Sequence, residues 1–158
     1  MFPLRPLVGS DRNQLIDIYR DAVLSQAEGL YTAAQIEAWA HHAARTDALT
    51  AALERGIGLA SCALGDPQRI EAFALLEPLD RLSLLYCRGR SCRQGRAKAL
   101  LEALEREALG RGCRRLRTEA SQLSRPLLER LGWSVEAEEV AELSGERFLR
   151  WRMIKPLA

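Results

Sequence analysis

The chain has 158 residues, an ordinary length for one domain, and such a chain buries about 70% of its unfolded surface without a disulfide or metal. Its 47% hydrophobic and 28% charged residues exclude intrinsic disorder. The longest stretch without a charge, 56–65, is about half a membrane span, and the first residues lack a signal-peptide profile. We therefore expect a single domain over residues 1–158 in a soluble, cytoplasmic protein.

The first 40 residues predict a strand followed by helices. Residues 3–8 contain two prolines, which cannot donate to a β-ladder, so this strand is expected at a sheet edge. A helix is expected to begin at Ser10, a favourable N-cap, because apolar residues follow at helical spacing as far as Val23. Thr32 and Gln35 have the spacing of a capping box and predict a second helix.

The next segment changes from helix to strand. A short third helix is expected to begin at Thr46 or Asp47 and to end near Gly56. Turns are expected at residues 66–68 and 78–80. The strands are expected at 57–64, 70–77 and 82–88. The last of them is apolar on both faces, which is typical of a central strand.

The clearest helical pattern begins at Ala97, because apolar residues follow at offsets of 3, 4, 7 and 11 until Gly110. Later elements are expected as a strand at 114–120, a helix at 124–131, and a hairpin of strands 133–143 and 147–155 around Ser144-Gly145. The main order is strand, helix, helix, three strands, helix, strand, helix and two strands. It predicts an α+β fold with a central sheet flanked by helices.

Four cysteines and two histidines give no metal or redox motif. The cysteines at 62, 87, 92 and 113 form no C-x-x-C pair, and the histidines are adjacent, which does not suit two ligands on one helix face. No metal is predicted, and the thiols are expected to be reduced.

The net charge of +2 conceals a basic segment. Residues 81–101 carry six basic side chains and no acidic one, so the other 137 residues sum to 2 − 6 = −4. The six are Arg81, Arg88, Arg90, Arg93, Arg96 and Lys98. Positive charge beside Gly95, at the start of a helix, favours an anion and above all a phosphate. A solvated basic loop is the alternative, and the P-loop and G-x-G-x-x-G patterns are absent.

The segment from Leu84 to Glu102 resembles the strand, pyrophosphate loop and helix of the GNAT superfamily of acyl-CoA-dependent N-acetyltransferases. The usual loop is Q/R-x-x-G-x-G/A; Gly95 and Ala97 match its last two positions, while Cys92 replaces the first. Further segments resemble a bacterial, small single-domain subgroup, at 30–39, 118–121, 125–133 and 153–157. The resemblance implies a mixed, mostly antiparallel central sheet.

The family resemblance also implies direct transfer of an acetyl group from acetyl-CoA to an amine of a small molecule or peptide. A backbone N–H near Cys87 is expected to stabilise the oxyanion. The implied CoA-binding residues are Leu85, Tyr86, Cys87, Arg88, Cys92, Arg93, Gln94, Gly95, Arg96 and Ala97.

The acid–base groups of the family are not matched in this sequence. Leu128 stands where a tyrosine is common, and Ser83 where an acidic residue is frequent. Tyr86 and Ser121 are therefore the candidate catalytic residues. Core packing is the alternative for Tyr86, and helix capping for Ser121.

Acceptor binding is expected in the helical region near the N-terminus. Tyr31, Trp39 and His42 are the candidate substrate-binding residues. The expected partner is the amine substrate, with no nucleic acid and no membrane; a homodimer is left open. A non-catalytic acyl-CoA-binding protein, in which the acid–base groups have been lost, is the alternative function.

Overall fold

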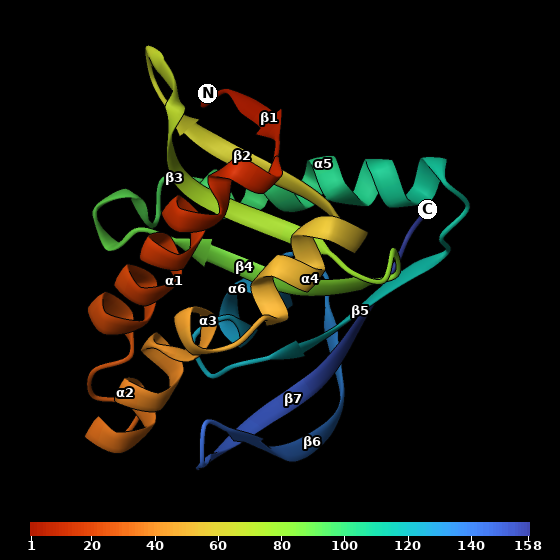
Figure 1. Cartoon of the computed structure of the whole chain (residues 1–158). Coiled ribbons are helices and arrows are strands. Elements are labelled where there is room, and N and C mark those ends of the chain that lie inside the picture. The colour runs from red at the N-terminus through yellow and green to blue at the C-terminus, as the bar shows by residue number, and fades with distance from the viewer.

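The computed structural model describes all 158 residues and contains one seven-stranded sheet in the order β1-β2-β3-β4-β5-β7-β6 (Figure 1). The strands are β1 (Leu4–Pro6), β2 (Ile57–Ala63), β3 (Asp66–Leu76), β4 (Arg81–Cys87), β5 (Arg115–Ala120), β6 (Ser134–Leu143) and β7 (Glu146–Pro156). Only β4 and β5 run parallel. The expectation of a mixed, mostly antiparallel sheet in an α+β fold is confirmed, and β4 is central.

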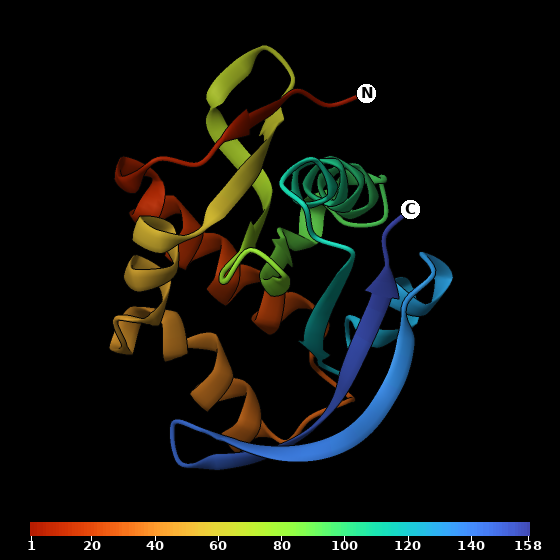
Figure 2. The same cartoon turned by 90° about the vertical axis from the view of Figure 1, so that its right-hand side faces the viewer.

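Helices cover both faces of the sheet. They are α1 (Arg12–Gln26), α2 (Ala33–Ala40), α3 (His42–Arg45), α4 (Ala48–Arg55), α5 (Arg96–Gly110) and α6 (Arg125–Arg130). Figure 2 shows α1–α4 on one side of the sheet and α5 and α6 on the other. Each face has its own hydrophobic core of 14 buried residues, so side chains that alternate along one strand enter different cores.

Two helices form for reasons that are local in sequence. Thr32 Oγ1 accepts the Gln35 amide at 3.1 Å, and Gln35 Oε1 accepts the Thr32 amide at 2.9 Å, so the predicted capping box begins α2. In α5 the buried residues follow the apolar periodicity that predicted the helix.

Two local predictions were wrong, and one short helix was not predicted. Ser10 does not cap α1; residues 9–11 form a 3₁₀ turn, η1 (Gly9–Asp11), and the carboxylate of Asp11 binds Arg5. The turn expected at 66–68 lies at 64–65, where Gly65 has a φ of +78°. The third helix is confirmed as α4, with Asp47 as its N-cap and Gly56 as its C-cap, whereas the short helix α3 was not predicted.

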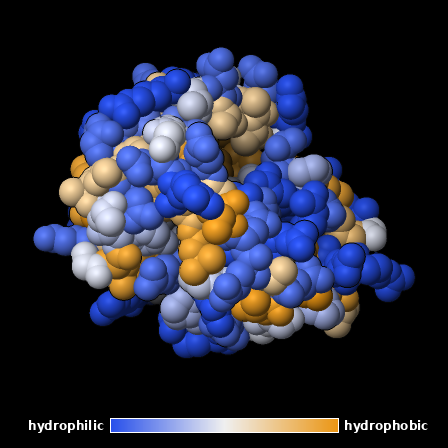
Figure 3. All heavy atoms as spheres, turned by 90° about the horizontal axis from the view of Figure 1, so that it is seen from below, coloured by the Kyte–Doolittle hydropathy of each residue, from blue (hydrophilic) through white to orange (hydrophobic).

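One face of the molecule, seen from below, has no broad apolar region. On the side seen from below, hydrophobic residues form small groups separated by hydrophilic ones (Figure 3). None of the helices combines the length and the apolar composition that crossing a bilayer requires.

Candidate active site

The site lies where β4 and β5 separate. Only two residue pairs join the strands, Arg81 with Arg117 and Leu82 with Thr118. Beyond them the strands diverge toward their C-terminal ends (Figure 1). Residues 83–87 of β4 therefore keep backbone N–H and C=O groups that no strand on this side satisfies.

A β-bulge marks the point of separation. Leu75 of β3 pairs with Leu84 and Leu76 pairs with Leu82, so Ser83 is the extra residue. Its hydroxyl donates to the carbonyl of Leu75 at 3.1 Å. Because a bulge bends and twists its strand, this one accounts for β4 turning away from β5 just beyond the last pair.

A cavity of about 790 Å³ occupies the gap between the strands. It is lined by α1, β4, the loop after β4, the N-terminus of α5, β5 and α6, and its volume is typical of a ligand site. Ten of the predicted site residues line it: Trp39, Leu85, Tyr86, Cys87, Cys92, Arg93, Gly95, Arg96, Ala97 and Ser121. Four do not: Tyr31, His42, Arg88 and Gln94.

The N-terminus of α5 faces this cavity without a capping side chain. Gly95 is the N-cap, with a φ of +87°, and no side chain accepts the first amides of the helix. Arg93 also has a positive φ, +61°. A Cβ built on Gly95 meets nothing within 4 Å, so the space above the amides is open. The arrangement is a cradle for an anion such as a pyrophosphate.

Arg96 lies beneath this cradle and is 5% exposed. Its Nη1 donates to Ser61 Oγ at 2.9 Å and to the carbonyl of Cys62 at 3.1 Å, and its guanidinium stacks on Phe2. Its buried Nε has no acceptor in the protein. Arg96 is therefore not an exposed side chain that reaches a phosphate. Its buried positive charge lies at the N-terminus of α5, and this charge adds to the helix dipole in favouring an anion there.

Two other arginines of the segment are engaged within the protein, which corrects the expectation that they offer free donors. Arg88 donates to Asp17 at 2.8 Å, and Arg90 forms a two-bond pair with Glu71 at 2.9 and 2.6 Å. The carboxylates come from α1 and β3, outside the basic segment itself. Arg93 remains exposed and forms no ion pair.

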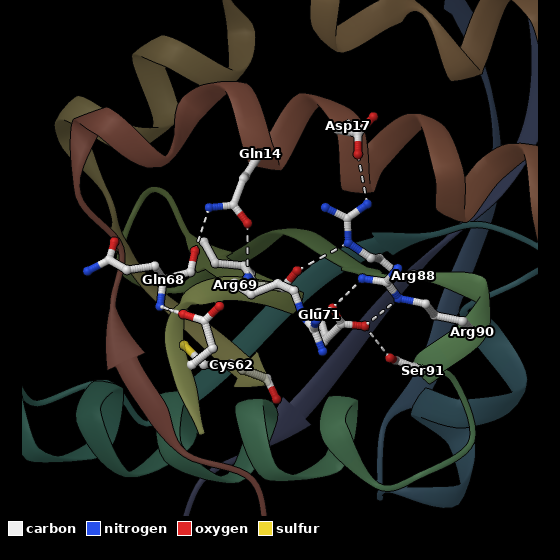
Figure 4. A network of polar contacts seen from close by, with 12 residues as sticks. Gln14, Asp17, Cys62, Gln68, Arg69, Glu71, Arg88, Arg90 and Ser91 are labelled. Atoms are coloured by element: carbon white, nitrogen blue, oxygen red, sulfur yellow. Dashed lines mark hydrogen bonds and ion pairs between the residues drawn. The ribbon is translucent and has the colours of Figure 1, made fainter. Parts of the chain in front are cut away.

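Glu71 anchors the loop that joins β4 to the cradle (Figure 4). This carboxylate is 3% exposed and accepts hydrogen bonds from Arg90 and from the hydroxyl of Ser91. Its backbone carbonyl accepts the Arg88 amide at 2.9 Å, and Asp21 accepts the Gly89 amide at 2.8 Å. The loop is thereby held to β3 and α1, so the cradle is preorganised.

The Glu71 network predicts a specific loss of stability in acid. Hydrogen bonds from Arg90 above all, with Ser91 adding to them, lower the pKa of Glu71 from 4.5 to about 2. A carboxylate with a lowered pKa stabilises the fold above pH 4.5, and this stabilisation is lost as the pH falls toward 2. Its full contribution is about 3 kcal/mol. We expect Glu71→Gln to unfold at a lower temperature than wild type at pH 7, with the difference shrinking between pH 4.5 and 2.5.

Thermal unfolding of both proteins across this pH range checks the prediction. Glu37→Gln is the matched control, because Glu37 also pairs with an arginine, Arg45, but at the fully exposed surface. Its pH profile should follow that of wild type. A difference between Glu71→Gln and wild type that stays constant with pH would contradict the role given to Glu71.

Tyr86 belongs to an aromatic cluster at the edge of the cavity. Its hydroxyl accepts Trp39 Nε1 at 3.2 Å, and its ring lies 4.3 Å from that of Tyr19 and 5.9 Å from that of Phe73, centroid to centroid. Burial raises the pKa of Tyr86. The residue thus both packs in the core and lines the cavity, and its catalytic role stays a prediction.

Ser121 caps the turn that leads into α6. Its Oγ accepts the amides of Leu123 and Ser124, each at 3.2 Å, while it also lines the cavity. Capping, one of the two roles weighed for Ser121, is therefore present, and a contact with substrate stays a prediction. The hydroxyl of Tyr31 accepts the Gln122 amide at 2.9 Å, which also stabilises this turn.

His42 does not line the cavity, and its assignment to the acceptor site stays a prediction. Its Nδ1 is 3.0 Å from Ser144 Oγ in the β6–β7 turn, so it joins α3 to the hairpin. Burial lowers the pKa of His42. Among the polar lining residues that received no role from the sequence are Gln26, whose amide donates to the Cys87 carbonyl at 3.1 Å, and Glu119.

The thiol beside the open strand is unsuited to nucleophilic catalysis. Burial raises the pKa of Cys87 from 9.0 to about 12, so this residue is protonated near neutral pH. All four cysteines are unpaired.

Fold and site together place an uncapped helix N-terminus at a cavity between two splayed parallel strands. Residues 27–155 match the family model described as an acetyltransferase (GNAT) domain. The chain therefore belongs to the GNAT acetyltransferase family, and it is an acyltransferase whose cosubstrate is acetyl-CoA.

Solved structures agree with the family assignment. A GCN5-related N-acetyltransferase from Rhodopseudomonas palustris is 26% identical with a TM-score of 0.91, over 99% of this chain and 96% of that one. The PaiA N-acetyltransferase from Thermoplasma acidophilum, solved with coenzyme A, is 19% identical with a TM-score of 0.78, over 99% of each chain. The latter likeness supports the fold alone. A comparison with curated protein sequences gives no significant match.

Proposed function

We propose that this protein is an N-acetyltransferase that moves an acetyl group from acetyl-CoA directly to an amine of a small molecule or peptide. The observation that carries the proposal is one continuous cavity, which joins the uncapped N-terminus of α5 to the unpaired edge of β4. Acetyl-CoA supplies a thioester that an amine attacks. We also propose that the chain acts as one domain in the cytoplasm, in keeping with its unpaired cysteines.

In this proposal the backbone performs most of the binding. The amides of residues 93–97 bind the pyrophosphate, assisted by the charges of Arg93 and Arg96. The N–H and C=O groups of residues 83–86 that point away from β3 bind the pantetheine arm as a further strand would. An amide at this open edge, near Cys87, is positioned to stabilise an oxyanion.

The alternative is a protein that binds acyl-CoA without turnover. One observation favours it: no histidine lines the cavity, and Tyr86 and Ser121 both have structural partners. Under this alternative CoA still stabilises the fold, because the cradle does not depend on an acid or a base.

Release of free thiol from acetyl-CoA, measured over a panel of amines, tests the proposal. We expect multiple turnovers per protein molecule with at least one amine, above the rate without an acceptor, and a mass increase of that amine by one acetyl group. CoA should also raise the melting temperature. Thermal stabilisation by CoA without turnover on any amine would establish the non-catalytic alternative.

A further inference from the structure

Glu119 is the only carboxylate among the residues that line the large cavity. Its side chain is 17% exposed, so the charge is held at the cavity wall rather than in bulk solvent. Glu119 and Thr118 also line a second cavity of about 240 Å³, which makes the carboxylate part of the wall that the two cavities share.

The carboxylate faces the side of the sheet that α1 and α2 cover. Thr118 and Ala120 are buried, and Ala120 belongs to the core under α5 and α6, so Glu119 between them points to the opposite face. Leu84 and Tyr86 point to that same face. The anion cradle at α5 and the Glu119 carboxylate therefore belong to different parts of the cavity wall.

Arg81 fixes the orientation of Glu119. Arg81 Nε and Nη2 donate to Oε1 at 3.1 and 2.9 Å, and Nε lies 3.2 Å from Oε2. Arg152, the cross-strand neighbour of Glu119, instead pairs with Glu139. Glu119 therefore has one arginine partner, and Oε2 retains acceptor capacity for a further donor.

Much of the remaining wall on this side of the cavity is apolar, although Ser25 and Gln26 of α1 also line it. Its lining includes Val23, Leu30, Trp39, Leu84, Tyr86 and Leu123. A cation that meets Glu119 would thus have apolar and aromatic surface around the remainder of its molecule, and aromatic faces also attract cations.

We propose that Glu119 binds the protonated amino group of the acceptor, and that the acceptor is a primary amine carried on an apolar body of aromatic size. Arg81 acts as a positioning residue. This inference rests on the proposed function, because it concerns the second substrate of that same site.

Direct binding measured by calorimetry in the absence of acetyl-CoA tests this inference, with 2-phenylethylamine, 2-phenylethanol and putrescine as probes. The alcohol has the apolar body without the charge, and putrescine has charge without the body. We expect wild type to bind 2-phenylethylamine about tenfold more tightly than either, since a hydrogen bond to a charged group is lost in the alcohol. Glu119→Gln should bind the amine and the alcohol equally, while its CoA affinity is unchanged.

Asp80→Asn is the matched control, because Asp80 pairs with Arg117 beside the Arg81–Glu119 pair but lines neither cavity. It should bind the three probes as wild type does. Wild type without a preference for the amine, or a preference that survives in Glu119→Gln, would overturn the assignment. If wild type binds putrescine more tightly than 2-phenylethylamine, the proposal that the acceptor has an apolar body is wrong.

The same proteins separate this inference from the proposed function. If wild type binds 2-phenylethylamine through Glu119 but acetylates no amine, the assignment of Glu119 stands and the enzymatic proposal fails. If amines are acetylated with the same KM by wild type and Glu119→Gln, the enzymatic proposal stands and Glu119 is not the acceptor-binding residue.

Discussion

Replacing Gly95 with valine is expected to weaken CoA binding by about 100-fold or more. Gly95 has a φ of +87°, and a side chain there projects into the open space above the first amides of α5. An anion displaced from that space loses hydrogen bonds that are worth about 1.5–3 kcal/mol each because one partner is charged. The loss of two such bonds is sufficient for the predicted change.

Calorimetry with CoA measures this change, and Gly112→Val is the matched control. Gly112 follows the other end of α5, has a φ of +96°, and a Cβ there also meets nothing within 4 Å. Both variants strain a left-handed backbone position, so both should lose stability. Only Gly95→Val should lose affinity for CoA. If both variants bind CoA as wild type does, the pyrophosphate is not held at this loop.

The features predicted correctly from the sequence depend on neighbours in the chain. The capping box of α2 needs two residues three positions apart, and α5 needs one repeating apolar pattern. Gly95 was assigned to the anion loop by its place between a strand and that helix, and its left-handed backbone fits this assignment. The family resemblance supplied the mixed, mostly antiparallel character of the sheet, which local patterns do not determine.

The partners of the arginines in the basic segment could not be predicted from neighbouring residues in the sequence. The segment contains no acidic residue, yet Arg81 and Arg88 meet carboxylates that are 38 and 71 positions away. Because β3, α1 and β2 pack around the loop, Arg88 pairs with Asp17 and Arg90 with Glu71, while Arg96 is buried against Ser61 and Cys62. A run of like charges therefore indicated the location of the cradle but not which side chains are free to bind.

The separation of β4 from β5 was also invisible in the sequence. It depends on a bulge at Ser83 and on a register with only two paired residues. Glu119 lay within a segment used for the family resemblance, but nothing in that segment showed that it would be the one carboxylate at the cavity. Gln26 is the last residue of an amphipathic helix, and no neighbouring residue in the sequence indicates that its amide donates to the Cys87 carbonyl.

The structure also explains what a tyrosine at position 128 would meet. Leu128 is 1% exposed and belongs to the core beneath α5 and α6, while it also borders the cavity. A larger ring must displace core neighbours, at a cost of about 1–3 kcal/mol. The effect of the hydroxyl can therefore be separated from the packing cost of the ring only by comparing tyrosine with phenylalanine at position 128.

Leu128→Tyr is expected to turn over about tenfold faster than Leu128→Phe, with CoA affinity equal within a few-fold. General acid catalysis contributes about 10²–10⁴-fold, but a thiol with a pKa of about 8.5 already leaves readily near neutral pH, so the smaller gain is expected. Both variants should unfold at similarly reduced temperatures, because they add the same ring. Steady-state thiol release with a common amine gives the ratio of kcat. If the two variants turn over equally, the added hydroxyl does not reach the leaving sulfur, and another donor on the cavity wall, such as Tyr86, supplies the proton in the wild-type protein.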